Sequence, residues 1–465
     1  MAYPTILMNS TSGSDSNASG AGPTTAITST SASTSSDGLT VTIPNADLTD
    51  VVTDGSHAVY ISGEGLRSIT GKADSGLSTA NVTVGTAFTV SLTGQTAAIG
   101  GVRQYLFGST KSEIESSCEA GWTISLAAGY TENLTAVTSL SFVDTSDNPI
   151  TITGDENNRA KFISIHGAFA YSFDFSSSHG LRVFNIDFEH YRGSDSSGNG
   201  EGHYIVYCPA RSYWKNCSVL VRRQYHGMAM FYTRYNTLVT FVNCEAKVTE
   251  DSAYKYTRSV GFSGRAYSCI NCKTRYTLTA FNAQAFSAYQ VLIAFCQMDT
   301  ATGIHVGGNG YDIGGSFVGN IMKIQSGGAA FSRNGPYNYH TTSNYHMINN
   351  VATSDGSYDA FKIYTPKSPE RYKRIILSYN CFGGSGAIDS DLDGVLQVEN
   401  ITDDPQLTGV VGSFAIGNKT VLDHVSMSPL VSPVFSSSTT GTQIYPFRQF
   451  VSDKFGAVLH PLRSN

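Results

Sequence analysis

The sequence has few charged residues: Asp, Glu, Lys and Arg together make up 14% of its 465 residues, against about 25% in an average soluble protein. Long amphipathic helices need a charged face toward solvent, so a coiled coil or helical bundle is disfavoured. Gly (46), Tyr (26) and Phe (24) are abundant instead. The composition predicts an all-β protein built from strands and turns.

The sequence also lacks an excess of positive charge and any long apolar run. Its net charge is −6 and its pI is near 6.0, so the overall field does not attract phosphate backbones or anionic lipids, and nucleic acid is disfavoured as the main ligand. No stretch approaches the roughly 20 apolar residues of a membrane span, and the start, MAYPTILMNS, has no basic leader. We expect a soluble protein with no membrane insertion and no export signal.

Covalent and metal chemistry is weakly represented. The eight cysteines lie in a chain long enough to form a core without disulfides, so we expect them to be reduced. Cys269 and Cys272 have CxxC spacing but no second pair, which disfavours zinc binding and redox activity. The motifs H-E-x-x-H, G-x-S-x-G and the P-loop are absent from the sequence.

Composition and local patterns divide the chain into four parts. Residues 1–37 are rich in Ser, Thr, Gly and Ala and predict a flexible arm, either a disordered tail or a segment that docks on a partner. Residues 38–101 contain short β-like runs and predict a small β domain. At Thr110 to Glu113 a T-x-x-E motif predicts a short capping helix that opens a long body, 102–400. Residues 401–465 form a closing segment.

A two-residue unit recurs through the body, and seven of its eight copies begin with Asn. Successive copies are 24 to 31 residues apart, the length of one coil of a solenoid. The unit occurs at Asn185-Ile186, Asn216-Cys217, Asn243-Cys244, Asn271-Cys272, Phe295-Cys296, Asn320-Ile321, Asn350-Val351 and Asn380-Cys381.

The residues around this unit alternate with a period of two, as in strands. In FVNCEAKV, Val242, Cys244, Ala246 and Val248 share one face. Stacking the coils predicts an inner column in which cysteine acts as a small core residue, with the asparagines as a second ladder. The predicted column contains Ile186, Cys217, Cys244, Cys272, Cys296, Ile321, Val351 and Cys381.

With these repeated units, each the rung of one coil, the sequence resembles the right-handed parallel β-helix proteins of bacteriophage virions. This family includes tailspikes, head fibres and related appendages. DGSHAVYISG (54–63) and AAIGG (97–101) are similar to the small N-terminal domain of many phage β-helix proteins, and Asp404 to Leu407, Ser428 to Leu430 and Asp453 to Gly456 resemble the way such chains close. The resemblance implies a homotrimer on the virion surface, attached to other capsid or tail proteins through its N-terminal region.

Polysaccharide-cleaving β-helices carry two or three carboxylates on an exposed face. Glu245 and Asp299 are candidates, but the register places Lys273 and Arg275 opposite them, which predicts a salt ladder. Asp187 and Glu189 have no such partners on the next rung and are the best uncompensated pair, a weak catalytic candidate.

A calcium site is a weak alternative elsewhere in the chain. Asp389, Asp391 and Asp393 alternate before Gly394 like the first half of a calcium loop. The twelfth position is Asn400 instead of Glu, so a polar turn is the simpler interpretation and no cofactor is expected.

Tyrosines gather in the central rungs, where 19 of the 26 lie between residues 201 and 380. Tyrosine suits either a glycan-binding face or a subunit interface. The resemblance to phage β-helix proteins implies a non-enzymatic virion spike or fibre, on the capsid or tail, that serves in surface decoration or host attachment, and the tyrosines are consistent with binding of host polysaccharide. The alternatives are a tailspike depolymerase, either a hydrolase or a lyase, and a bacterial surface adhesin.

Overall fold

The computed structural model describes residues 5–14, 27–55, 57–74, 79–109, 111–142, 148–165, 171–191, 203–222, 228–233, 238–249, 256, 259–265, 267–284, 291–306, 314–333, 344–363, 375–384, 387–388 and 395–426. The chain divides into two units: Met1–Ile163 with Asp174–Asp187, and Ser164–Phe173 with Phe188–Asn465. Apart from two short helices, the described secondary structure is β. The predicted all-β class is confirmed, with a parallel β-solenoid and a small N-terminal β-barrel domain.

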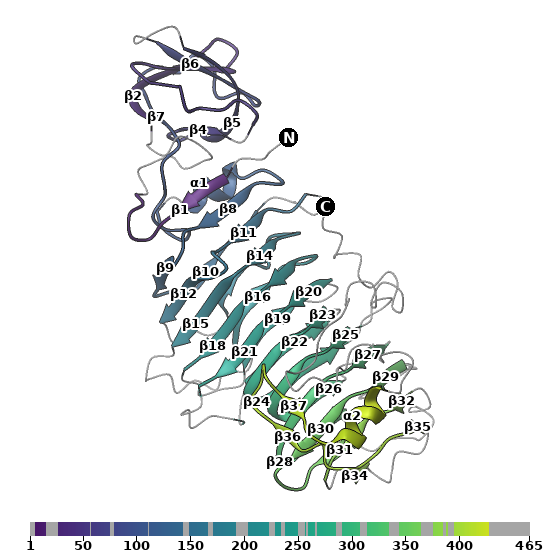
Figure 1. The fold of residues 1–465 in the computed structure, drawn as a ribbon. Helices are drawn as coiled ribbons and strands as arrows, with labels where there is room; N and C mark the ends of the chain where they lie inside the picture. The colour runs from purple at the N-terminus through teal and green to yellow at the C-terminus, as the bar shows by residue number, and fades with distance from the viewer. Residues whose placement is uncertain are drawn as a thin grey trace. The chain divides into compact units, whose positions relative to one another are not determined.

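The first unit contains the barrel, which is closed by antiparallel strands (Figure 1). Its alternating apolar residues, such as Val41, Val59 and Val82, form a separate core with no exposed area. In order around the barrel the strands are β2 (Ile27–Thr34), β3 (Thr40–Ile43), β6 (Ala80–Val84), β5 (Gly65–Asp74), β4 (Ala58–Ile61) and β7 (Gln95–Ile99).

Two strands lie within the segment predicted as a flexible arm. β1 (Thr5–Met8) pairs in parallel with β8 (Thr123–Leu126) and buries Ile6 and Met8. β2 pairs with β7 and β3 of the barrel. Backbone hydrogen bonds to neighbouring strands hold both segments, although β2 has few apolar side chains, and composition alone does not reveal such pairing.

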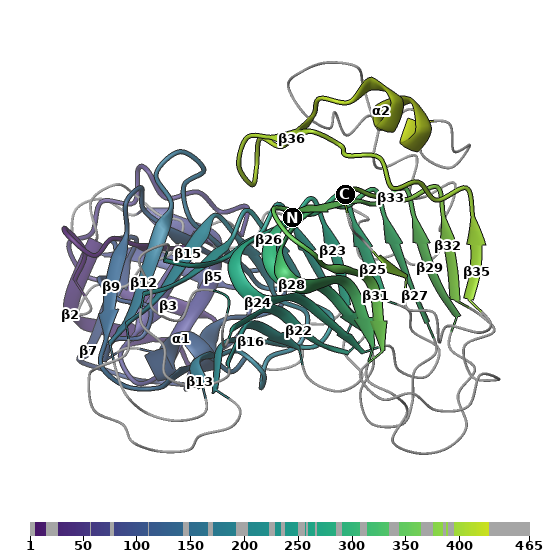
Figure 2. The ribbon, with the colours of Figure 1, turned by 90° about the horizontal axis from the view of Figure 1, so that it is seen from below.

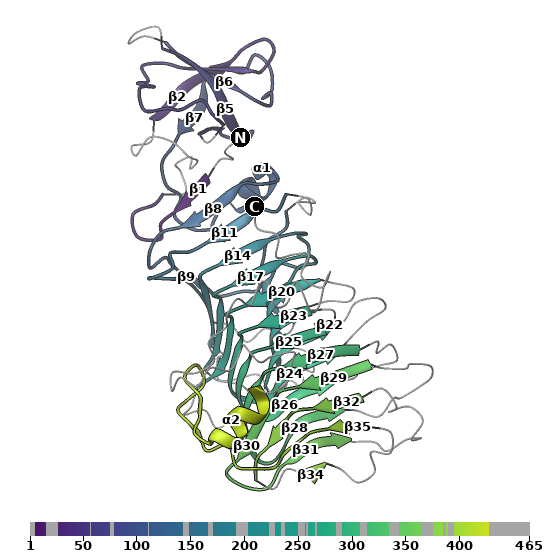
Figure 3. The ribbon, with the colours of Figure 1, turned by 45° about the vertical axis from the view of Figure 1, so that its right-hand side comes forward.

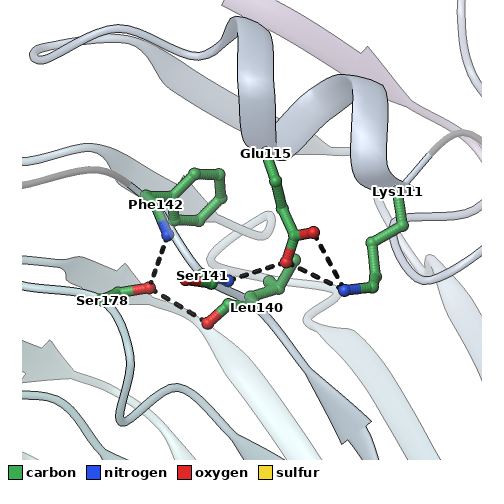
Figure 4. Close-up of polar contacts among 6 residues, drawn as sticks. All are labelled: Lys111, Glu115, Leu140, Ser141, Phe142 and Ser178. Carbon is green, nitrogen blue, oxygen red and sulfur yellow. Dashed lines mark hydrogen bonds and ion pairs between the residues drawn. The ribbon is translucent and has the colours of Figure 1, made fainter.

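Helix α1 (Lys111–Ser117) covers the first coils of the same unit. Glu115 forms an ion pair with Lys111 at 2.9 Å and accepts a hydrogen bond from the Ser141 N–H at 2.7 Å (Figure 4). Nearby, Ser178 Oγ accepts from the Phe142 N–H and donates to the Leu140 carbonyl. The helix lies where the T-x-x-E motif predicts it, although Thr110 lies outside the described residues. The remaining strands that begin in this unit are β9 (Thr131–Leu134), β10 (Thr138–Ser139), β11 (Thr151–Thr153), β12 (Ala160–Ile165), β14 (Arg182–Phe184) and β15 (Ile186–Tyr191).

The second unit is a stack of coils in which strands pair in parallel with their counterparts one coil later (Figure 3). One sheet contains β17 (Tyr213–Lys215), β20 (Val239–Val242), β23 (Tyr267–Ile270), β25 (Val291–Ala294), β27 (Gly314–Val318), β29 (Asn344–Ile348), β32 (Ile375–Ser378) and β35 (Val395–Val398). The other contains β13 (Tyr171–Asp174), β16 (His203–Cys208), β18 (Ser218–Val221), β19 (Met228–Thr233), β21 (Glu245–Val248), β22 (Ser259–Arg265), β24 (Lys273–Gln284), β26 (Gln297–Val306), β28 (Ile321–Arg333), β30 (Val351–Ser354), β31 (Asp359–Ile363), β33 (Cys381–Phe382) and β34 (Ala387–Ile388).

A phenylalanine stack lies inside this unit. Phe231, Phe262 and Phe281 are in register on successive coils, and neighbouring rings lie 5.0 and 5.1 Å apart in nearly parallel planes. Phe331 and Phe361 continue the row two and three coils later. The stack is fully buried and contributes a large part of the apolar core.

Each cysteine of the column directly follows a corner of the coil, between a strand of the first sheet listed above and a strand of the other. Asn216, Asn243 and Asn271 each adopt a φ between 52° and 55° at this corner, a left-handed conformation that Asn tolerates better than most residues. The next residue of each coil is a buried cysteine. The Cys244 thiol, for example, donates to the Trp214 carbonyl of the preceding coil at 3.6 Å.

Past Cys296 the observed register differs from the prediction by one residue. Gln297 pairs with Ile321, so Asn320, not Ile321, follows Cys296 in the column. The same shift replaces Val351 by Asn350 and Cys381 by Asn380. The corner conformation here belongs to Gly319, Asn349 and Tyr379, so aligning Asn with Asn in the sequence misplaces these coils. The predicted column is therefore wrong at Ile321, Val351 and Cys381.

The asparagines that continue the column are hydrogen-bonded to one another. The Asn350 amide donates to Asn380 Oδ1 at 2.9 Å and accepts from Asn320 Nδ2 at 2.8 Å. It also donates to the Phe317 carbonyl, the equivalent of the carbonyl that each thiol contacts. Asn400 accepts the corresponding bond from Asn380 at the last coil. The corner asparagines form a second, exposed ladder, in which Asn271 donates to Asn243 at 2.7 Å.

The closing segment folds back onto the outside of the coils (Figure 2). β36 (Leu407–Thr408) and β37 (Ala415–Ile416) form an antiparallel hairpin, followed by α2 (Lys419–Ser426). Val421 and Val425 of α2 are fully buried in a cluster that includes Val351 and Cys381. Among the described residues no helix is long and apolar enough to cross a membrane.

Candidate functional site

The carboxylates predicted as an uncompensated pair both have arginine partners. Asp187 forms an ion pair with Arg159 at 3.2 Å, and Glu189, only 5% exposed, forms one with Arg222 at 3.4 Å. Tyr191 donates a further hydrogen bond to Glu189 at 3.0 Å. The prediction that this pair lacks partners is wrong, because Arg159 and Arg222 reach it from positions that the rung-by-rung comparison did not include.

The second pair of candidate carboxylates lies in the predicted register. Glu245 is opposite Lys273, and Asp299 is opposite Arg275. The ion pair of Glu245, however, is with Arg275, at 2.8 Å, two residues along β24 from the expected partner Lys273. Asp299 accepts a short hydrogen bond from the Tyr256 hydroxyl.

Asp389, Asp391 and Asp393, the weak calcium candidates, lie outside the described residues. Asn400, which would be the twelfth position of the calcium loop, accepts a hydrogen bond from Asn380 and donates to the Leu377 carbonyl. Its amide is thus engaged in the column. The described part of the chain contains no group of three or more His, Cys, Asp or Glu placed to hold a metal ion.

All eight cysteines are buried, and none forms a disulfide. Burial raises the pKa of the Cys244 and Cys269 thiols well above the usual value. A thiol must ionise to attack or to bind metal, so these are core residues. The buried Ser332 hydroxyl lies 2.8 Å from His305 Nδ1, but Ser332 has no exposed area, and this pair does not form an accessible nucleophile.

A cavity of about 530 Å³ lies on the outer face of the second unit, between strands β24 to β30 and the tip of the closing hairpin. Its volume is typical of small-ligand pockets. Its lining includes two tyrosines, two cationic side chains and two carboxylates: Tyr256, Tyr276, Arg275, Lys323, Asp299 and Asp355.

Both tyrosines adopt a left-handed backbone conformation. Tyr256 and Tyr276 each have φ of 60°, which is uncommon for residues other than Gly, Asn and Asp. Tyr276 lies at a bulge in β24, where the pairing with β26 shifts between Arg275 and Thr277, and its carbonyl accepts the Tyr256 N–H at 3.0 Å. Bulges redirect side chains, and strained residues that persist in a fold are enriched at functional sites.

The two cations of the pocket are held differently. Arg275 contacts Glu245 and donates from Nη2 to the Val411 carbonyl at 2.6 Å. Lys323 forms an ion pair with Asp355 at 3.1 Å, and the two side chains are 42% and 87% exposed. Arg275 is therefore held by two partners, Glu245 and the Val411 carbonyl. The partner of Lys323, Asp355, is by contrast largely exposed to solvent.

The closing hairpin forms one wall of the pocket. Val411 and Phe414 pack on Ile321, and the Gly412 N–H donates to Gln297 Oε1 at 2.6 Å. Gly412 has φ of +99° and lies against Lys273 and Arg275. The pocket thus depends on the docking of a segment that lies more than 50 residues further along the chain than the strands that form its floor.

The sequence indicates only part of this site. The concentration of tyrosines in the central rungs predicts its aromatic character, but that signal also fits a second cluster, in which Tyr204 and Tyr232 stack with ring centroids 3.7 Å apart. Asp299 and Arg275 are predicted as members of a salt ladder. The roles of Lys323, Asp355 and the hairpin are missed, because they depend on the bulge and on the path of the closing segment.

Comparison with known proteins identifies no family for this chain. No family model matches it, and no curated protein matches it. Among solved structures, the catalytic unit of a thermostable alpha-1,3-glucanase from Streptomyces thermodiastaticus is similar, with 11% sequence identity and a TM-score of 0.39 over 81% of this chain and 86% of that chain.

Proposed function

We propose that this protein is a glycan-binding β-solenoid whose ligand occupies the pocket between β24 to β30 and the closing hairpin. The observation that carries the proposal is the pair of tyrosines in left-handed conformation beside Arg275, Asp299 and Lys323. Aromatic rings supply apolar contact for a sugar ring, while charged and hydroxyl groups pair with its hydroxyls.

The test is calorimetric titration of the full chain with oligosaccharides from bacterial capsule and lipopolysaccharide, comparing wild type with Tyr276→Asn. Asn keeps the tolerance for positive φ but removes the ring. We expect binding to fall by at least about tenfold, the equivalent of one lost stacking contact. The matched control is Tyr204→Ala in the other tyrosine cluster. Loss of binding in the control and not in Tyr276→Asn would move the site to that cluster.

We further propose that the protein is a homotrimeric, non-enzymatic component of a phage virion, where binding serves host attachment or surface decoration. This is supported by the resemblance of the rung and domain motifs to phage β-helix proteins and by the combination of an N-terminal barrel with a solenoid. The N-terminal region is the proposed attachment to other virion proteins. Mass spectrometry of purified particles and light scattering of the isolated chain test location and trimer separately, and a stable monomer at micromolar concentration would count against the trimer.

A depolymerase is a second candidate, because the pocket contains two carboxylates from different coils, Asp299 on β26 and Asp355 just after β30. Asp299, Lys323 and Thr353 are in register on three successive strands, so two strand spacings, about 9.6 Å, separate the backbones at Asp299 and Thr353. Asp355 lies two residues further on and is mostly exposed, unlike the desolvated setting of a general acid. The test is a reducing-end assay with Asp299→Asn and Asp355→Asn; activity that either variant abolishes would favour the enzyme over the binding protein.

A further inference from the structure

The pocket contains one ion pair that a ligand can take over. Lys323 faces the cavity, and its partner Asp355 follows the end of β30 with 87% of its side chain exposed. Exposed ion pairs contribute little to stability, so exchanging the carboxylate of Asp355 for another carboxylate costs little. The ammonium group is already positioned within the cavity for such an exchange.

The other cation of the cavity is not available in the same way. The Arg275 side chain is 26% exposed, contacts Glu245 at 2.8 Å and is bonded to the Val411 carbonyl of the hairpin. These contacts hold Arg275 to the floor and the wall of the pocket, so a ligand that approaches its remaining N–H groups does not replace either partner as readily as it replaces the exposed Asp355. Of the cations that line the cavity in the described chain, Lys323 is thus the one with a replaceable partner.

We infer that the glycan bound in this pocket is acidic, with a sugar carboxylate that replaces Asp355 at Lys323 while Tyr256 and Tyr276 contact the ring. This inference deepens the proposed function and depends on it. It makes Asp355 a competitor of the ligand. For a neutral glycan the expectation is the reverse, because Asp355 would then accept hydrogen bonds from sugar hydroxyls.

The experiment titrates the full chain with oligogalacturonate, oligoglucuronate and oligosialate, each beside its carboxyl-reduced, neutral counterpart. We expect the wild type to bind at least one acidic oligosaccharide about tenfold more tightly than its reduced form, as a charge-assisted contact requires. That preference should weaken as salt rises. Lys323→Gln should lose the preference, Lys323→Arg should keep most of it, and Asp355→Asn should bind the acidic form more tightly than wild type.

A second ion pair on the same sheet provides the control. Lys362 and Asp359 are 3.1 Å apart with 37% and 38% exposure and do not line the cavity. Lys362→Gln and Asp359→Asn should leave every affinity unchanged.

The outcomes separate this inference from the proposed function. Equal binding of acidic and reduced forms, or weaker acidic binding by Asp355→Asn, overturns the inference while glycan binding stands. Failure of all acidic probes while neutral capsule oligosaccharides bind also overturns the inference alone. Failure of every glycan overturns both.

Discussion

Replacing Asn350 by Ala should destabilise the second unit more than any single change on its outer surface. The Asn350 amide donates to the Phe317 carbonyl and to Asn380, and it accepts from both the backbone N–H and the side chain of Asn320. Asn350 has no exposed area. Truncation therefore leaves the Asn320 donors without this acceptor in a place that water does not reach.

Each buried group left unsatisfied costs about 1–3 kcal/mol. Two donors, together with a small cavity, give an expected loss of about 3–6 kcal/mol in the free energy of unfolding. Asn350→Cys should cost less, about 1–3 kcal/mol, since a thiol fills part of the space, donates weakly and accepts weakly. In the column Cys296 Sγ accepts from the Cys272 N–H at 3.4 Å, the equivalent of the bond from the Asn320 N–H. At the equivalent position Cys244 donates to the Trp214 carbonyl.

The measurement is urea unfolding followed by circular dichroism, with hydrogen exchange of the peptides around residue 320 as a local readout. The matched control is Asn243→Gly in the exposed ladder, which removes an amide but suits the φ of 54°; a loss below about 1 kcal/mol is expected there. If Asn350→Ala proves as stable as wild type, or if the control costs more, the reasoning about the buried ladder is refuted.

Three further changes test other parts of the structure. Burial lowers the pKa of His305 from 6.5 to about 4, so below pH 6.5 the unfolded chain takes up a proton that the folded chain does not. Stability should fall by up to about 3 kcal/mol between pH 6.5 and 4, and this slope should flatten in His305→Gln; an unchanged slope would assign it to other groups. Gly412→Val should raise hydrogen exchange in 407–416 without affecting the barrel, because only glycine suits φ of +99°; unchanged exchange would show that the hairpin tolerates the strain. All eight cysteines should resist alkylation by iodoacetamide until urea unfolds the chain, because they are buried, and rapid labelling of Cys244 in native buffer would contradict the column.

The repeat, the strand alternation and the position of α1 are predictable from the sequence because each depends on local spacing. Cys244 and Cys272, for example, follow the same corner residue on adjacent coils and occupy equivalent positions. The two strands within residues 1–37 are not predictable in this way. β1 is held by a strand that begins at residue 123 and β2 by a strand near residue 97. Neither the short TILM run of β1 nor the Ser- and Thr-rich composition of β2 indicates these distant partners.

The one-residue register error also explains why the pocket is absent from the sequence prediction. The position after the column is polar on four successive coils, at Ser218, Glu245, Lys273 and Gln297. On the next four it is apolar, at Ile321, Val351, Cys381 and Ile401. Because side chains alternate between the faces of a strand, the one-residue shift moves Ile321, Val351 and Cys381 from the predicted inner column to the outer face.

An apolar outer row needs a cover, and the closing segment supplies it. Val421 and Val425 pack over Val351 and Cys381, and the hairpin packs over Ile321. As the closing segment covers the four apolar side chains, its hairpin tip reaches the coil of Gln297, the last polar residue of the row. There Gln297 receives the Gly412 N–H, and Arg275, from the neighbouring β24, binds the Val411 carbonyl. The wall of the pocket therefore lies where the row changes from polar, at Gln297, to apolar, at Ile321. The residue type at this single position of each coil thus determines where the proposed binding site forms.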